Sequence, residues 1–237
     1  MSVIAVTRIV VNPGDDSEGQ AMMSLGRLVP PGLAMIAVTY GLARFAYGLF
    51  LPDMREAFDL SPSLLGVIGA GSYLGYCVAV VISLVYTSRT GPRLMAVAAG
   101  AVAVAGMATV AISPMAWVLA LGILVAGSST GLASPPMGEA VARSIRNSLQ
   151  DRANALINSG TSVGVAISGP AALLLTGQWR LAWTAFALVL APVLIGLLLR
   201  VFASELVERM LPVLPLIAAY QARRRERMLA RARAAGA

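Results

Sequence analysis

Long apolar stretches, separated by short charged segments, dominate the hydropathy pattern of this chain. A bilayer core of about 30 Å needs about 20 apolar helical residues, because an α-helix rises about 1.5 Å per residue. Four stretches without a charged side chain reach this length, at residues 60–88, 94–138, 153–179 and 181–199. The longest of them holds two crossings, and Ser113-Pro114 is the expected turn between them.

This pattern predicts six transmembrane helices and an all-α fold. Lipid cannot satisfy free backbone groups, so helices and closed barrels are the possible spanning structures. The stretches are too long and too uniformly apolar for the alternating strands of a barrel. We expect spans near residues 30–51, 63–86, 94–112, 115–138, 153–176 and 181–200. The predicted organisation is an N-terminal segment, a six-helix domain and a basic tail, at residues 1–27, 28–200 and 201–237.

The arginines predict the orientation of the bundle. All 18 basic side chains are arginine, against 11 acidic ones. With the N-terminus inside, Arg55 and Arg180 lie outside and Arg44 lies within a span, which leaves 18 − 3 = 15 on the cytoplasmic side. Cytoplasmic loops of membrane proteins carry such an excess. We therefore expect a multi-pass protein of a bacterial inner membrane, with both termini cytoplasmic and residues 53–61 external.

The composition excludes several classes of function. The chain has no histidine and one cysteine, Cys77. A histidine base, a Cys/His zinc site and a disulfide framework are therefore impossible within it. No cluster of nucleophile and base is apparent, so we expect no enzyme activity, no cofactor and no metal. The lipid bilayer is the expected surrounding, and no nucleic-acid partner is expected.

Polar residues within the spans predict which helices face a substrate cavity. Tyr40, Arg44 and Tyr47 are spaced by four and three residues, which places them on one face of an ordinary helix. Polar groups also recur in the second, fourth and fifth spans, whereas the third and sixth have few, so these two are expected at the periphery. An alternative is that the hydroxyls bond their own helix backbone. The cavity candidates are Tyr40, Arg44, Tyr47, Tyr73, Tyr76, Asn154, Asn158 and Thr161.

Small residues predict close helix packing in the same set of spans. Pairs of glycines four residues apart let helix backbones approach each other. They occur in the second, fourth and fifth spans, where the packing candidates are Gly71, Gly75, Gly127, Gly131, Gly160, Gly164 and, as a helix interruption, Pro170.

Three segments together resemble a known transporter family. The turn after the second span keeps Arg89, Gly91 and Arg93 in a basic, glycine-containing sequence, with Ser88 where the family has an acidic residue. The fifth span carries a glycine-proline pattern that ends at Pro170. The first span has Gly-Leu-Ala-Arg-Phe-Ala-Tyr followed by Leu-Pro, at residues 41–52. These features resemble the amino-terminal half of a Major Facilitator Superfamily transporter, and the first span resembles its YbfB/YjiJ-like branch, over about residues 28–200.

The resemblance implies a secondary active transporter of a small molecule, whose first, second, fourth and fifth helices line the cavity. It assigns a gating role to Arg89, Gly91 and Arg93. Members have two six-helix halves, so the resemblance implies a half-length or truncated chain that needs a second half or a homodimer. The alternative is a non-transporting membrane subunit or an inactive fragment of a split transporter.

Two charged residues are open to more than one interpretation. Arg44 suits either an anionic substrate or a carboxylate from another helix, because its guanidinium offers a fixed fork of donors. Glu139 is the acid nearest to a span, and it either couples transport to protons or pairs with Arg143 four residues later.

Overall fold

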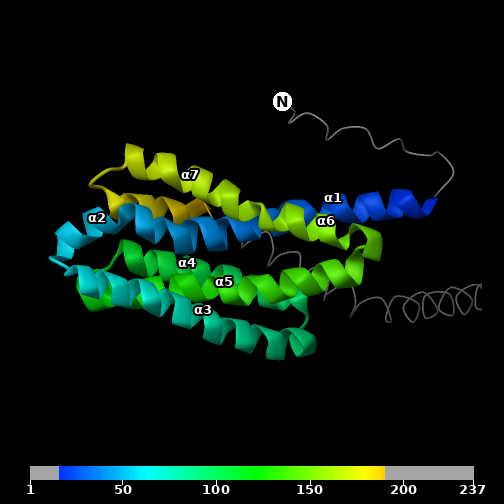
Figure 1. The fold of residues 1–237 in the computed structure, drawn as a ribbon, viewed down its shortest axis with the longest axis horizontal. Coiled ribbons are helices and arrows are strands. Elements are labelled where there is room, and N and C mark those ends of the chain that lie inside the picture. The colour runs from blue at the N-terminus through cyan, green and yellow to red at the C-terminus, as the bar shows by residue number, and fades with distance from the viewer. Residues whose placement is uncertain (1–15, 190–237) are drawn as a thin grey trace, which may run out of the picture. The chain divides into compact units, whose positions relative to one another are not determined.

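The computed structural model describes residues 16–189, and side-chain surroundings from residue 25 (Figure 1). This part of the chain consists of helices joined by short turns and contains no strand, which confirms the all-α class. Within residues 16–189, four helices are long and apolar enough to cross a membrane: Leu25–Phe58, Pro62–Thr90, Pro92–Ala111 and Ala116–Ser144. They coincide closely with the first four predicted spans.

The first crossing is one continuous helix with a change of winding in its middle. It consists of α1 (Asp16–Ile36), η1 (Ala37–Phe45) and α2 (Ala46–Phe58), of which η1 is π-helical. The helix begins at Asp16, ahead of the predicted domain boundary at residue 28. A π-helical stretch is rare and is found frequently at functional sites.

The ends of the next two helices follow from local sequence. Asp59 ends α2 in the left-handed conformation, at φ 50°. Ser61 then caps α3 (Pro62–Thr90) by accepting a hydrogen bond from the Leu64 backbone N–H, as N-cap residues commonly do. Gly91, at φ 84°, separates α3 from α4 (Pro92–Ala111) in a turn that favours glycine.

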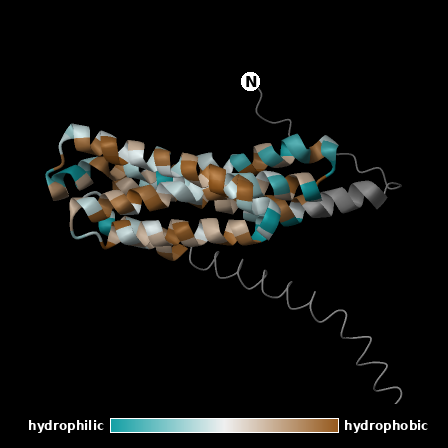
Figure 2. Cartoon of the chain, turned by 90° about the horizontal axis from the view of Figure 1, so that it is seen from below, coloured by the Kyte–Doolittle hydropathy of each residue, from teal (hydrophilic) through white to brown (hydrophobic). Residues whose placement is uncertain are grey.

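Helix α5 (Ala116–Ser144) packs lengthwise against both α3 and α4. Glycine makes these contacts close. A Cβ atom on Gly131 would meet the backbone of Tyr76, and one on Gly106 would meet the backbone of Ala126. Hydrophobic residues cover most of the length of these helices, while hydrophilic residues gather toward helix ends (Figure 2). This distribution suits helices that cross a bilayer.

The fifth predicted span consists of helices α6 (Asn147–Asn158) and α7 (Gly160–Leu174), which meet at Ser159 with helical dihedral angles of φ −60° and ψ −17°. Hydrogen bonds of the helical type continue across this residue, from the Ser159 N–H to the Ala155 carbonyl over 3.0 Å and from the Val163 N–H to the Ser159 carbonyl over 3.2 Å. Beyond a turn at Gly177, a helix covers residues 179–189. The remainder of the predicted sixth span and the basic tail lie outside the described residues, so the count of six stays a prediction.

The predicted peripheral position of the third span is wrong with respect to burial. Within its most apolar window, α4 is 56% buried, whereas α3 is only 22% buried. The side-chain hydroxyl of Thr109, the polar residue noted in this span, bonds the Ala105 carbonyl of its own helix. A helix without polar groups therefore packs as readily against other helices as against lipid, because alanine and glycine permit close approach.

An aromatic cluster closes one end of the bundle. Phe50 of α2 and Trp183 are fully buried, and both lie next to Phe186. The ring centroids are 6.2 Å apart for Phe50 and Phe186, and 6.4 Å apart for Trp183 and Phe186, in edge-to-face arrangements. Such pairs stabilise a core beyond their buried area.

Candidate functional site

Arg44 lies at the end of η1, in the middle of the first crossing. Its half-buried side chain reaches toward α3 and α5, the two helices that also carry the predicted polar groups. The wider turn of the π-helix sets the direction of this side chain. The same turn changes the phase of every residue that follows it.

Aromatic rings surround the guanidinium group of Arg44. Its central carbon lies 4.3 Å from the ring centroid of Tyr73 and 4.5 Å from that of Tyr76. The rings of Phe45 and Tyr40 are farther away, at 5.7 and 5.9 Å. Cation–π contacts of this kind stabilise a guanidinium group without neutralising its charge. Tyr40, Tyr73 and Tyr76 are three of the predicted cavity residues, and the structure brings them together around Arg44.

The hydrogen bonds of the guanidinium group are incomplete. Its Nη1 donates to Thr130 Oγ1 over a long distance of 3.4 Å. Its Nε is buried and has no acceptor among the residues described. None of the acidic side chains in residues 25–189 forms an ion pair with Arg44. A buried donor left without an acceptor costs about 1–3 kcal/mol, so this N–H is available to donate a hydrogen bond to an oxygen of a ligand.

Two hydroxyl groups of α5 complete the cluster. Tyr40 and Ser134 share a hydrogen bond of 2.5 Å between their oxygens, and Thr130 donates to the backbone carbonyl of Gly127. The cavity prediction omitted Thr130 and Ser134, although both belong to the polar part of the fourth span. Their spacing of four residues, which places them on one helical face, is the signal that could have identified them.

Tyr47 lies apart from this cluster. It is 7% exposed within the hydrophobic core, and its hydroxyl donates to the carbonyl of Leu65 over 3.1 Å. The prediction assumed an ordinary helix between Tyr40 and Tyr47. That assumption does not hold, because residues 37–45 are π-helical, and the hydroxyl of Tyr47 bonds the start of α3.

The predicted polar stripe of the fifth span lies on α6 and α7. Asn158 is exposed, and its side-chain amide donates to the Asn154 carbonyl over 2.9 Å. Asn154 and Thr161 are half-buried. These helices pack against α1 and η1, where a Cβ atom on Gly164 would meet the backbone of Ala37. Among the described residues, no hydrogen bond links the stripe to Arg44, whose hydrogen bond goes to Thr130.

The remaining packing candidates differ in their surroundings. Gly75, Gly127 and Gly160 lie against a neighbouring helix, as predicted. An added Cβ atom on Gly71 would meet no atom of the described residues within 4 Å. Gly71 therefore marks a face of α3 that this unit leaves open. Pro170 is an exposed residue inside α7.

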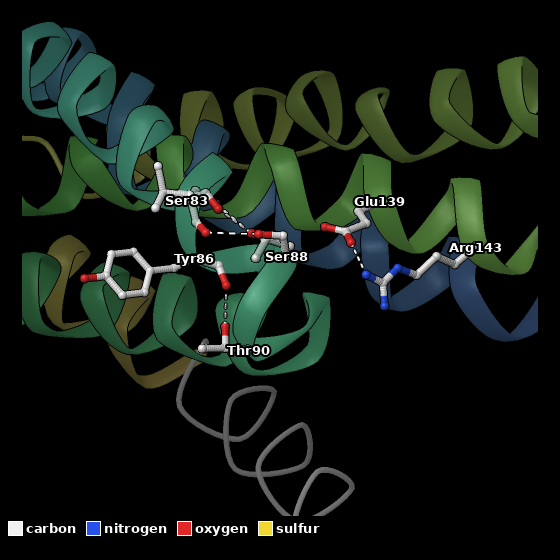
Figure 3. Close-up of polar contacts among 8 residues, drawn as sticks. Ser83, Tyr86, Ser88, Thr90, Glu139 and Arg143 are labelled. Carbon is white, nitrogen blue, oxygen red and sulfur yellow. Dashed lines mark hydrogen bonds and ion pairs between the residues drawn. The ribbon is translucent and has the colours of Figure 1, made fainter.

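The predicted gating residues lie at the turn from α3 to α4. Arg89 and Arg93 are exposed, and Gly91 adopts the positive φ described above. The hydroxyl of Ser88 donates to the carbonyl of Val85 in its own helix, over 3.1 Å (Figure 3).

The nearby carboxylate of Glu139 pairs with the guanidinium of Arg143 on α5 (Figure 3), which bears out the pairing interpretation of Glu139. An ion pair four residues apart on a helix is a local contact of modest strength.

The comparisons with known proteins identify a family. Residues 33–230 match the model of the Major Facilitator Superfamily. The match extends 30 residues past the predicted limit at residue 200, into the segment predicted as a basic tail. None of the curated proteins is significantly similar to the chain.

Proposed function

Because this chain belongs to the Major Facilitator Superfamily, a family of membrane transporters, we propose that it transports a small anionic molecule. Arg44 is the group that binds the charge of this molecule. Tyr40, Tyr73 and Tyr76 line the same site, and Asn154, Asn158 and Thr161 line a further part of the cavity.

The observation that carries this proposal is the incomplete hydrogen bonding of Arg44. A guanidinium group within a membrane span is costly, by about 2.5 kcal/mol or more at mid-depth. Proteins usually offset such a cost with a carboxylate partner, and residues 25–189 supply none to Arg44. An anionic substrate supplies the missing acceptor. The competing source is a carboxylate from a second transporter half.

A second six-helix unit is part of the proposal. Helix α3 carries Tyr73 of the site, and it exposes Tyr73 by 57%, Leu74 by 65% and Val81 by 62%. Halves of this family are parallel repeats, related by an axis along the membrane normal. A separately encoded half or a second copy of the chain would thus cover this face without inverting its orientation.

The proposed location is a bacterial inner membrane, with both termini in the cytoplasm. The support is the excess of arginine in the predicted cytoplasmic segments. In this orientation Arg89, Gly91 and Arg93 lie at the cytoplasmic end of α3, where they contribute to gating. A cysteine introduced at Glu56 should react with an impermeant reagent added outside cells, and reaction from the cytoplasmic side alone would reverse the topology.

Transport is tested with the full chain in proteoliposomes. Uptake of radiolabelled carboxylates and phosphate esters is measured together with the particle mass in nanodiscs. We expect anion uptake by a dimer, or after co-reconstitution with a second six-helix chain. Uptake by a strict monomer would refute the requirement for a second unit. Absence of anion uptake in every assembly would favour the non-transporting alternative.

A further inference from the structure

The charged residues within the described spans indicate how many negative charges the anion carries. Arg44 is the single charged residue between positions 28 and 52, and positions 60–88, 94–138 and 153–179 carry no charge. The interior of this unit therefore offers one positive charge. Each Arg44 site, in one copy or in each of two, is neutralised by a ligand group with one negative charge, whereas a doubly charged group at one site would leave one charge buried without a partner.

The geometry of Arg44 restricts how a ligand approaches. The rings of Tyr73 and Tyr76 lie near the guanidinium group at 4.3 and 4.5 Å from its central carbon. Thr130 accepts from Nη1. Nε is buried without an acceptor among residues 25–189, and the hydrogen bond of Arg44 to Thr130 uses Nη1 rather than Nη2, which lies on the same edge as Nε. Two parallel N–H donors on one edge match the two oxygens of a carboxylate.

The residues around the Nε–Nη2 edge of Arg44 indicate the chemistry of the part of the ligand that lies next to its carboxylate. Four aromatic rings lie within 6 Å of the central carbon of Arg44, from Tyr40, Phe45, Tyr73 and Tyr76. Such a surface favours an apolar or aromatic body next to the carboxylate. The Tyr40–Ser134 pair is a second neutral polar group beside Thr130, since the Tyr40 ring is one of the four near Arg44. It provides a hydrogen bond without adding charge.

We infer that the Arg44 site takes a monocarboxylate with an apolar body, bound through the Nε–Nη2 edge. This inference rests on the proposed function and deepens it, because it selects one charge state and one geometry. Nε is enclosed in the present conformation. We expect the ring of Tyr73, which is 57% exposed and lies 4.3 Å from the central carbon of Arg44, to shift when a carboxylate reaches Nε.

Three probes with one phenyl body test the inference on the full chain in nanodiscs. Benzoate carries one charge, benzamide carries none, and phenyl phosphate carries two at a pH of about 8. Calorimetry should show benzoate binding at least about tenfold more tightly than either of the others. Arg44→Gln should reduce benzoate affinity at least about tenfold, because a neutral amide lacks the charge. Arg180→Gln, the matched control at the other aromatic-flanked arginine, should leave it unchanged.

Two results would overturn the inference: phenyl phosphate or benzamide binding as tightly as benzoate, or an Arg44→Gln variant that binds benzoate like the parent protein. The failure of the inference is distinguishable from that of the proposed function. Uptake of a dianion by proteoliposomes without benzoate binding would sink the monocarboxylate assignment and leave anion transport standing. Benzoate binding without any anion uptake would contradict anion transport and leave the monocarboxylate assignment of the site standing.

Discussion

Arg44 and Arg180 have similar aromatic neighbours and different hydrogen bonds. The central carbon of Arg180 lies 4.2 Å from the ring of Trp179, much as that of Arg44 lies 4.3 Å from the ring of Tyr73. Arg180, however, donates from Nη2 to the carbonyl of Ser113 over 2.8 Å. Arg44 has a weak hydroxyl contact at 3.4 Å. Aromatic contacts alone therefore do not separate a structural arginine from a binding one, but the hydrogen bonds do.

The surroundings of the two arginines extend this contrast. Arg180 belongs to a set of contacts that ties helix ends together, in which the Asp53 carboxylate also accepts from the backbone N–H of Gly177 over 3.0 Å. These groups satisfy backbone donors and acceptors that turns leave open. Arg44 ties no turn together. Arg44 lies within a π-helical stretch, and its Nε has no hydrogen-bond acceptor among the described residues. Features of this kind lower the stability of the folded protein and are typical of functional sites.

The largest effect should come from removing the charge of Arg44. Arg44→Gln should lower anion uptake by proteoliposomes at least about 100-fold, because the transported charge loses its charge-assisted hydrogen bonds. Radiolabelled uptake, normalised to the amount of inserted protein, measures this. Arg44→Lys keeps the charge but not the fork, so it should recover only part of the activity. Uptake by Arg44→Gln at the parent rate would remove Arg44 from the site.

A smaller effect should follow from displacing the helix that holds Arg44. A Cβ atom on Gly164 would meet the backbone of Ala37 and Gly41 in η1. Gly164→Ala should therefore destabilise the protein by about 1–3 kcal/mol and reduce uptake as well, since overpacking shifts backbone. Denaturant unfolding in mixed micelles measures the stability. The matched control is Gly71→Ala, whose added atom meets no described neighbour and should change neither property. Equal effects of the two substitutions would contradict the close contact of α7 with η1.

The smallest effect concerns Arg180. This side chain is exposed, so solvent screens its contacts. Arg180→Gln should lower the free energy of unfolding by about 1 kcal/mol, through loss of the hydrogen bond to the Ser113 carbonyl, and should leave uptake per folded molecule unchanged. Unfolding curves and uptake rates on the same preparation test both parts. Uptake lost in proportion to that of Arg44→Gln would erase the contrast between the two arginines.

Much of the fold was predictable from charge-free stretches, because a bilayer imposes both length and helical structure on them. The turn at Ser113-Pro114 was predicted for this reason, whereas the packing at Gly131 was predicted from pairs of glycines four residues apart. The π-helical stretch was not, since a shift of hydrogen bonds from i−4 to i−5 leaves no clear mark on hydropathy. That shift changes the phase of Tyr47 relative to Tyr40, so the ordinary helical spacing that grouped these two side chains does not apply.

The cluster itself was predicted in part. Arg44, Tyr73 and Tyr76 were identifiable as polar residues in apolar spans. The contribution of Thr130 and Ser134 was not, because hydroxyls that bond their own helix are common, and sequence does not distinguish those that also reach a neighbour. The burial of α4 was missed because an apolar helix surface suits lipid and protein equally.

The most direct test of the central claim is a comparison of thermal unfolding for the parent protein, Arg44→Gln and Arg180→Gln in nanodiscs without ligand. The account assigns a binding role to Arg44 and a structural role to Arg180. The Arg44→Gln variant should therefore unfold at the same temperature as the parent protein or at a higher one, because it removes a charged group whose hydrogen bonds are incomplete. Arg180→Gln should unfold at a lower temperature. A loss of stability in Arg44→Gln equal to or larger than that in Arg180→Gln would contradict the account.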